Sequence, residues 1–346
     1  MHRTALPRRA ATTLLASLAA AGAHAASFDC KMAKTPTEKA ICGSPRLSAL
    51  DEKLARDYER ALHALSPAGA TQLKASQRSW LRFATQVCVP RKKTPDGDPP
   101  ASCLEAEFKR RLEQLAQAGV RLGPYVFNRV DFYSSASTPG EGGTYPDFVV
   151  QHAGFPQIDS PANAATAAWN AAMRLDDPGP VSGRDSPDDE IEDDDTDYTF
   201  GCADSRFVSV QVDRSEYQHG TAHGGYDHQV TNLLLAPAAR KMAATDVFAA
   251  KAPWKTRLPA LFWKAYIQDA DANKDMPSIK EAIESVAVDP DRWLLTPDGL
   301  QVSFNAYEAG CYACNPGPIT VAWIDLKPML ATPDLAACKA PPHAKP

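Results

Sequence analysis

The first part of this chain takes its fold from residues 35–65, which read TPTEKAICGSPRLSALDEKLARDYERALHAL. The stretch opens with a capping box from Thr35 to Glu38, in which a proline takes the first helical position. Ser44-Pro45 starts a second helix in the same manner. Apolar side chains then recur every three or four residues and so share one helix face: Leu47, Leu50, Leu54, Tyr58, Leu62 and Leu65. The stretch predicts two consecutive helices that each bury one face.

The same helical signals continue to residue 118. Ser66-Pro67 opens a third helix, whose expected inward side chains are Leu73, Trp80, Leu81, Ala84 and Val87. A basic, proline-rich loop at 89–101 follows, and a capping box from Ser102 to Glu105 starts a last helix that ends at Gly119. The apolar face of that helix is Leu104, Phe108, Leu112 and Leu115. Residues 27–118 are therefore predicted to form a small all-helical domain, for which disulfide staples are useful.

The sequence pattern changes after Gly119. Strands are expected at 123–133, 147–151, 207–212, 229–235 and 319–324. Helices are expected at 161–174, with Trp169 and Met173 inside, and at 254–267 and 278–287. The turn Pro297-Asp298-Gly299 predicts a hairpin between 293–295 and 300–304. This order of elements indicates an α+β domain at 123–338 with a mostly antiparallel sheet, and the chain as a whole is predicted to be α+β.

An export signal precedes all the cysteines. In the first 26 residues, Arg3, Arg8 and Arg9 precede a short apolar run, and Ala23-His24-Ala25 is a cleavage site. The run is too short to span a bilayer, and no lipid-anchor motif is present. The mature protein is expected to be periplasmic or secreted, where an even number of cysteines favours disulfides. The eight cysteines are Cys30, Cys42, Cys88, Cys103, Cys202, Cys311, Cys314 and Cys338.

The first four cysteines flank helical segments. Cys30 and Cys42 bracket the first helix, and Cys88 and Cys103 bracket the loop between the two long helices, so these two pairs are favoured among three possible connectivities. For the last four, the interpretation stays open between a local Cys311–Cys314 bridge and bridges to Cys202 and Cys338. A redox site is less favoured because no strand-to-helix junction precedes Cys311. Zinc is disfavoured in an oxidising compartment.

Charge and motifs exclude several classes of function. The formal net charge is −5, and removal of the export signal with its three arginines and no acids lowers it to −8. Such a charge is unfavourable for nucleic acid or an anionic membrane and suits a basic protein partner. The sequence lacks a nucleophile elbow, a phosphate loop and a pair of carboxylates at a spacing that would indicate catalysis. We therefore expect no catalytic residues, no metal and no cofactor.

The best candidate contact is a glycine-rich segment at 219–226. His219, His223 and His228 are spaced four and five apart, which on a helix could bind zinc. The glycines at 220, 224 and 225 oppose a helix, so a tight turn with a hydrogen-bonded, partly buried His223 is predicted instead. Its candidate binding residues are His219, Gly220, His223 and Tyr226.

Two charged segments are weaker candidates for binding. Residues 183–197 carry nine carboxylates and are predicted to be a solvated loop, although Asp193, Asp194 and Asp195 could steer a basic partner. The basic trio Arg91, Lys92 and Lys93 lies on the loop between the long helices and is most simply an ordinary solvated segment.

Residues 27–118 resemble the N-terminal domain of the lysozyme inhibitor LprI family. The resemblance is carried by Phe28-Asp29-Cys30, Thr37 to Cys42, Leu47 to Asp51, Leu54 with Tyr58, Gln77 to Leu81, Cys88, Cys103-Leu104 and Arg111 to Leu115. It implies an all-helical domain that binds a protein and performs no catalysis.

The remainder resembles the RsiV-type C-terminal domain, which is DUF3298-like and occurs in an anti-sigma factor that senses lysozyme. The resemblance is carried by Gly220 to Gly224, Asn232, Asp246 with Phe248, Leu295 to Leu300, Phe304, Tyr307-Glu308, Tyr145-Pro146 and the helix around Asn170. The acidic segment at 183–197 and the stretch Gly310 to Cys314 depart from the family pattern.

Both resemblances imply the same class of partner. We expect a periplasmic or secreted protein that recognises and inhibits lysozyme-like muramidases by covering the glycan cleft. The alternatives are a peptidoglycan-associated enzyme or its substrate-binding module, which metal analysis and a turnover assay would reveal, and a structural module of the envelope.

The cysteine content leads to a first prediction. The mature protein isolated from an oxidising compartment should contain no free thiols, because eight cysteines after an export signal can all pair. Thiol titration under denaturing conditions tests this, and two or more free groups would contradict it. Reduction should mainly weaken the helical domain, where each bridge contributes about 2–4 kcal/mol.

Overall fold

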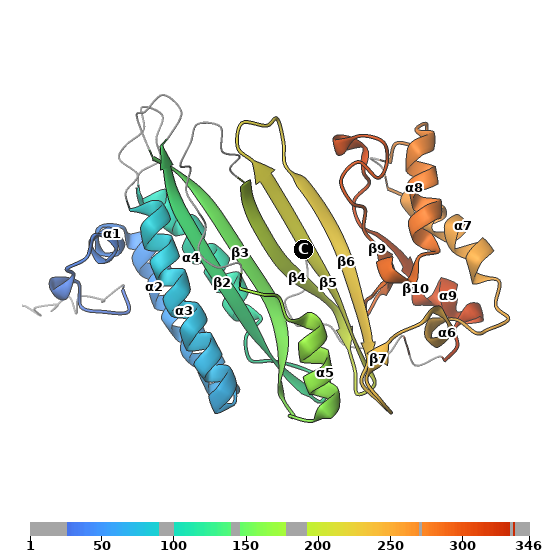
Figure 1. Cartoon of the computed structure of the whole chain (residues 1–346), viewed down its shortest axis with the longest axis horizontal. Coiled ribbons are helices and arrows are strands. Elements are labelled where there is room, and N and C mark those ends of the chain that lie inside the picture. The colour runs from blue at the N-terminus through green and yellow to red at the C-terminus, as the bar shows by residue number, and fades with distance from the viewer. Residues whose placement is uncertain are drawn as a thin grey trace, which may run out of the picture.

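The computed structural model describes residues 26–89, 100–139, 146–177, 192–269, 272–332 and 335. A helical unit lies on one side of a long twisted sheet, and a smaller sheet with its own helices lies on the other side (Figure 1). The predicted α+β class is confirmed. The expected export signal, Arg91 to Lys93 and Cys338 lie outside the described residues.

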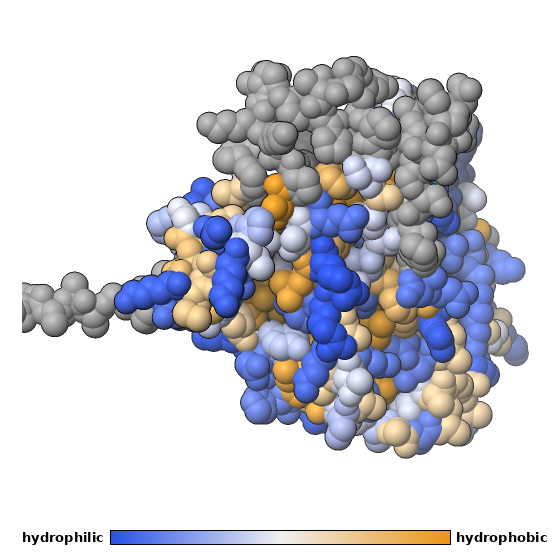
Figure 2. Space-filling view, turned by 60° about the vertical axis from the view of Figure 1, so that its left-hand side comes forward, coloured by the Kyte–Doolittle hydropathy of each residue, from blue (hydrophilic) through white to orange (hydrophobic). Residues whose placement is uncertain are grey.

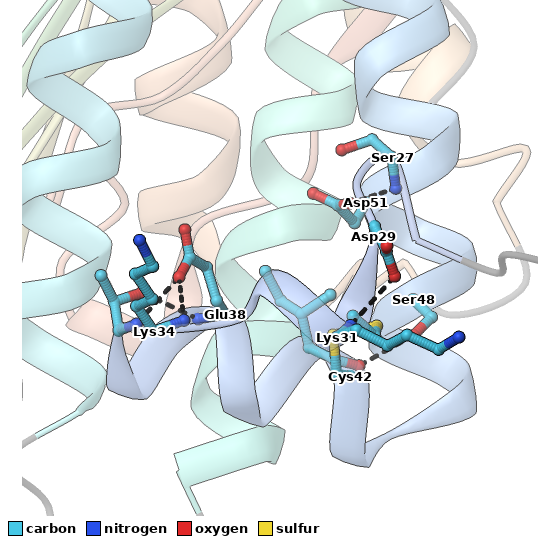
Figure 3. Close-up of a disulfide and its surroundings, with 11 residues drawn as sticks. Ser27, Asp29, Lys31, Lys34, Glu38, Cys42, Ser48 and Asp51 are labelled. Carbon is cyan, nitrogen blue, oxygen red and sulfur yellow. Dashed lines mark hydrogen bonds between the residues drawn. A yellow bond between two sulfur atoms is a disulfide. The ribbon is translucent and has the colours of Figure 1, made fainter.

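The helical unit contains a 3-10 turn, η1 (Cys30–Met32), and four helices: α1 (Pro36–Gly43), α2 (Pro45–Ala64), α3 (Pro67–Cys88) and α4 (Pro100–Ala116). The Thr35 hydroxyl accepts from the backbone of Glu38, whose carboxylate accepts in return from Lys34 and Thr35 (Figure 3). These backbone hydrogen bonds lower the pKa of Glu38. The predicted start of α4 at Ser102 is wrong, because Pro100 takes the first helical position, where a missing N–H costs nothing.

The core of this unit is the predicted apolar face with one exception. Leu47, Leu73, Trp80 and Leu104 are each at most 1% exposed, whereas Leu81 is 44% exposed. Trp80 and Leu81 are neighbours on α3 and point about 100° apart, so both cannot face one core. The outer face of the unit carries hydrophilic side chains with apolar ones scattered between them (Figure 2).

The disulfides of the helical unit are the predicted ones. Cys30 bonds Cys42 and Cys88 bonds Cys103. Near the first bridge, the Ser27 N–H donates to Asp51 at 2.7 Å and the Ser48 hydroxyl donates to the Ile41 carbonyl at 2.8 Å (Figure 3). The bridge therefore ties η1 to α1, and the two hydrogen bonds hold these segments against α2.

The long sheet has seven strands in sequential order: β1 (Val120–Leu122), β2 (Tyr125–Pro139), β3 (Pro146–Ser160), β4 (Glu192–Ala203), β5 (Phe207–Gln218), β6 (Gly225–Leu234) and β7 (Arg240–Lys241). All neighbours pair antiparallel except β3 and β4, which are parallel and enclose α5 (Ala164–Met173) in sequence. Trp169 and Met173 of α5 are buried as predicted. The prediction of a solvated loop through residue 197 is wrong for 192–197, which form the start of β4.

The last part of the chain builds a second core beside β5 and β6. Its elements are α6 (Ala244–Val247), α7 (Trp254–Tyr266), α8 (Pro277–Ala287), η3 (Pro290–Arg292), β8 (Leu294–Leu295), β9 (Gly299–Val302), η4 (Tyr312–Cys314), β10 (Ile319–Ala322), α9 (Trp323–Leu326) and η5 (Lys327–Met329). The hairpin at Pro297 to Gly299 is confirmed. The strand expected at 319–324 ends at Ala322, because Trp323 begins a helical turn.

Helix α3 lies along the open edge of β2. Its polar side chains Ser76, Ser79 and Gln86 donate to the carbonyls of alternate strand residues, at 3.3 Å to Asp131, 3.5 Å to Tyr133 and 3.1 Å to Ser135. A strand edge otherwise presents such groups to any extended chain. These contacts fix the helical unit against the sheet.

A substitution of Trp80 tests which face of α3 points into the core. It is 1% exposed and packs edge-on against Phe108 at a centroid distance of 5.1 Å. Trp80→Ala should lower the free energy of unfolding of the helical unit by about 3–5 kcal/mol, because it leaves a large cavity. Denaturant unfolding measures this, with Leu81→Ala as the exposed neighbour control. Equal losses from the two variants would mean that the assigned helix face is wrong.

Candidate functional site

The predicted glycine turn joins β5 and β6. Gly220 has a φ of +85°, a conformation that glycine adopts at little cost. The Thr221 hydroxyl donates to the Gln218 carbonyl at 2.7 Å, and the Tyr217 hydroxyl donates to the Thr221 carbonyl at 3.3 Å. The turn is thus closed by its own side chains. Two tyrosines, Tyr217 at its base and Tyr307 of the facing loop, are exposed by 39% and 51%.

His223 meets a second loop at 305–315. Its Nε2 lies 2.8 Å from the hydroxyl of Tyr307, and its ring stacks on Tyr312 with centroids 4.1 Å apart. The prediction of a hydrogen-bonded His223 is correct, but His223 is exposed rather than partly buried. Its partners are aromatic side chains of an adjacent loop at the surface, which leave one side of the ring open to solvent.

A polar network holds the 305–315 loop in place. Asn315 Nδ2 donates to the Tyr226 hydroxyl at 2.8 Å, and the backbone N–H of Ala306 donates to the Tyr226 carbonyl at 2.9 Å. Arg292 donates to both carboxylate oxygens of Glu308, at 2.8 and 2.9 Å. Tyr307 has a φ of +64°, a strained conformation for a bulky residue that such a network can maintain.

The cysteine pair near this loop forms the local bridge that was one of the open alternatives. Cys311 bonds Cys314 and encloses Tyr312, the stacking partner of His223. Cys202 is also disulfide-bonded. Among the described cysteines none is free. The local bridge restrains the backbone on both sides of Tyr312.

The acidic residues of β4 are paired rather than free. Asp193 Oδ2 lies 3.1 Å from His219 Nε2 and so links the acidic segment to the glycine turn. Asp194 lies 3.1 Å from Arg214 on the neighbouring strand. The strand places successive acids on opposite faces, which separates Asp194 from its two neighbours. The structure therefore brings Asp193 into the candidate site.

The three histidines have separate partners. His219 is close to Asp193, His223 to Tyr307, and His228 to Asp213 at 2.7 Å. They do not converge on one point, which agrees with the expectation that they are not a zinc set. Glu192, Asp194 and Glu216 have oxygens within 4.8 Å of one another, an arrangement that exposed acids often show without a metal.

A second polar cluster lies where the helices meet the sheet, and the sequence analysis did not find it. We call it the charge joint; it consists of Arg110 and Arg111 from α4, Arg129 and Asp131 from β2, His152 from β3, and Asp195 and Asp197 from β4. These residues come from segments far apart in sequence. Pattern reasoning could not group them, since each looks like an ordinary charged residue of a strand or helix.

Asp131 is the centre of the charge joint. Arg111 Nη1 donates to its Oδ2 at 2.8 Å and Arg129 Nε donates to its Oδ1 at 2.6 Å, and all three side chains are 1% exposed. Burial alone would raise the pKa of Asp131, but the guanidinium groups and His152 hold it well below the usual range. The surrounding charges therefore favour the ionised form of this carboxylate.

His152 bridges two carboxylates of the joint. Its Nε2 lies 3.1 Å from Asp131 Oδ1 and its Nδ1 lies 2.6 Å from Asp195 Oδ1. Burial alone would lower the pKa of His152, but these hydrogen bonds raise it. Arg110 Nη2 also reaches Asp195, at 2.5 Å. Asp195 is thus engaged within the charge joint.

The fold defines a two-part protein, in which a disulfide-bonded helical unit is fixed to the side of an α+β sheet domain. Residues 30–115 match the family model described as lysozyme inhibitor LprI. The predicted LprI resemblance is confirmed for this segment. In the ranges that the structure covers, no helix combines the length and apolar character needed to cross a membrane.

Two solved structures of DUF3298 family proteins are similar to this chain. One, from Bacteroides fragilis NCTC 9343, is 13% identical, covers 62% of this chain and 98% of its own, and has a TM-score of 0.40. The other, from Pseudomonas aeruginosa PAO1, is 14% identical, covers 61% of this chain and 96% of its own, and has a TM-score of 0.39. No curated protein matches the chain.

The charge joint leads to a prediction about stability. Asp131→Asn should lower the free energy of unfolding by about 3–5 kcal/mol, because it leaves buried Arg111 without its counter-charge and removes one of the two acidic partners of Arg129. Asp194→Asn is the matched control: its partner Arg214 is half exposed, so the loss should stay below about 1 kcal/mol. Urea unfolding of both variants decides the point. Comparable small losses would show that the joint contributes little to stability.

Proposed function

We propose that this protein binds lysozyme-like muramidases and inhibits them by covering the glycan cleft, without turnover of any substrate. The observation that carries the proposal is the match of residues 30–115 to the lysozyme inhibitor LprI family. A binding role also agrees with the candidate surface, where the exposed ring of His223 contacts Tyr307 and stacks on Tyr312.

A location outside the cytosol fits this role. The disulfides of the described residues are typical of an oxidising compartment. We propose that residues 1–26 direct export and that the mature protein is periplasmic or secreted. Within it, residues 27–118 and 123–338 are proposed as two domains that α3 and the charge joint hold together.

The proposed contact surface in the second domain is the turn at 219–226 with its neighbours. His219, Gly220, His223 and Tyr226 lie on or beside the turn, and Tyr307 and Tyr312 extend it. Rigid tyrosines make large contacts at small entropic cost, as in other binding loops. Of the acidic trio, Asp193 and Asp194 remain near this surface, whereas Asp195 is engaged in the charge joint.

Charge supports the choice of a basic muramidase as partner. The mature chain has a formal net charge of −8, and the segment from 215 to 226 contains a glutamate and no lysine or arginine. Long-range attraction of a basic partner raises the association rate more than the affinity. The rings at the turn would supply the short-range contacts that slow dissociation.

The test is a lysis assay with purified mature protein and muramidases of several classes, together with surface-based binding kinetics at two salt concentrations. Association should slow steeply as salt rises, because screening weakens the attraction between the partners. The double variant with Glu216→Gln and Asp194→Asn should associate more slowly than the wild type at the same salt concentration. Absence of binding to every muramidase class would defeat the proposal and favour a structural module of the envelope.

The turn is tested by His223→Ala, which removes the stack on Tyr312 and the contact with Tyr307. We expect the dissociation rate to rise about tenfold or more, as for a loss of at least 1.4 kcal/mol of binding energy. Ile324→Ala on α9 is the control, since Ile324 is 72% exposed and lies on an element remote in sequence from the turn. An unchanged dissociation rate for His223→Ala, with binding otherwise intact, would assign the contact to the LprI helices.

A further inference from the structure

His152 is a buried member of the charge joint. It lies on β3, is 4% exposed, and its ring faces Tyr133 at a centroid distance of 4.7 Å. Both ring nitrogens lie within hydrogen-bonding distance of carboxylate oxygens, Nε2 of Asp131 and Nδ1 of Asp195. A carboxylate can only accept, so both nitrogens must donate for both contacts to be favourable. Only the protonated imidazolium carries two N–H groups.

The groups around His152 come from every element packed against it. The groups are Ser76 and Gln77 of α3; Glu107, Arg110, Arg111 and Gln114 of α4; Arg129, Asp131 and Tyr133 of β2; and Asp195 and Asp197 of β4. Three arginines face three aspartates in this set. His152 and Glu107 are therefore the two members of this set whose protonation can change while the charges of the arginines and aspartates still cancel.

We infer that His152 is a proton-operated clamp that joins Asp131 of β2 to Asp195 of β4 across the charge joint, closed when the ring is charged and loosened when it is neutral. A neutral ring keeps one N–H and can retain the hydrogen bond to buried Asp131. Asp195 then faces an unprotonated Nδ1, which cannot donate a hydrogen bond to it. Arg110 Nη2 lies 3.1 Å from the same nitrogen and can donate to it instead. The contact from β3 to β4 is weakened at that point.

The direction of the pH effect follows from the groups involved. The pKa of His152 is raised, so its contribution is fully present below the ordinary histidine value and is lost as pH rises through the raised value. The pKa values of Asp131 and Asp195 are lowered, so both stay ionised across this range. Burial raises the pKa of Glu107, whose ionisation with rising pH adds a cost of the same sign. Alkaline pH should therefore loosen the joint.

The test is native-state hydrogen exchange on the full mature chain at pH 6 and pH 9, corrected for the intrinsic rate of each amide. In the wild type, protection in β2, β3 and β4 should fall about tenfold for each unit by which the His152 pKa is raised, while β8 and β9 stay constant. His152→Gln keeps a similar shape but cannot be protonated, so its joint should be loosened at both pH values and should keep only the pH dependence that Glu107 contributes. His63→Gln, an exposed histidine of α2, is the control and should behave as wild type.

Two outcomes would overturn the inference. One is a fall in protection with pH that persists unchanged in His152→Gln. The other comes from the wild type alone and applies even where His152→Gln fails to fold: nitrogen-resolved NMR showing His152 neutral at pH 6. The inference needs no muramidase, so its failure and that of the proposed function are distinguishable.

Discussion

The arrangement of this protein depends on one buried carboxylate, that of Asp131. It sits on β2 and accepts from Arg111 of a helix and Arg129 of its own strand, with all three side chains removed from water. Desolvation of charges is so costly that they must be paired and hydrogen-bonded. Because α4 supplies one partner, the helical unit and the sheet cannot separate without exposing or orphaning a charge. The same site brings in His152 and, through it, β4.

The helical unit could be predicted almost completely from the sequence because its determinants are local. Capping boxes, prolines at helix starts and apolar spacing lie within a few residues of one another, and flanking cysteines identify their partners. The prediction that Leu81 faces the core is wrong because adjacent residues of a helix point in different directions, and Trp80 already faces the core. The predicted start of α4 is wrong because Pro100 and Ser102 both favour a helix start. The sequence alone does not show at which of them the helix begins.

The candidate site was only partly predictable. The glycine turn was visible, but Tyr307 and Tyr312 contact it from more than eighty residues away. The sequence singled out Tyr307 and the stretch from Gly310 to Cys314 for other reasons and did not place them beside the turn. The acids of 192–197 resembled a solvated run because charge density predicts exposure. Their arginine and histidine partners lie on other strands and on α4, and pairing across such distances leaves no periodic pattern.

Beyond the short edge strands β1 and β7, parts of β2 and β6 are covered by other segments. Along β2, α3 supplies donors to alternate carbonyls; along β6, the Ala306 N–H donates to Tyr226, and the Asn305 side chain accepts from the His228 N–H at 2.8 Å. A partner therefore cannot extend this sheet with a strand of its own at these positions, the mode known as β-augmentation. Recognition has to use side chains on preformed loops and helices. The same protection guards against fibre-like stacking when the protein is concentrated in a confined compartment.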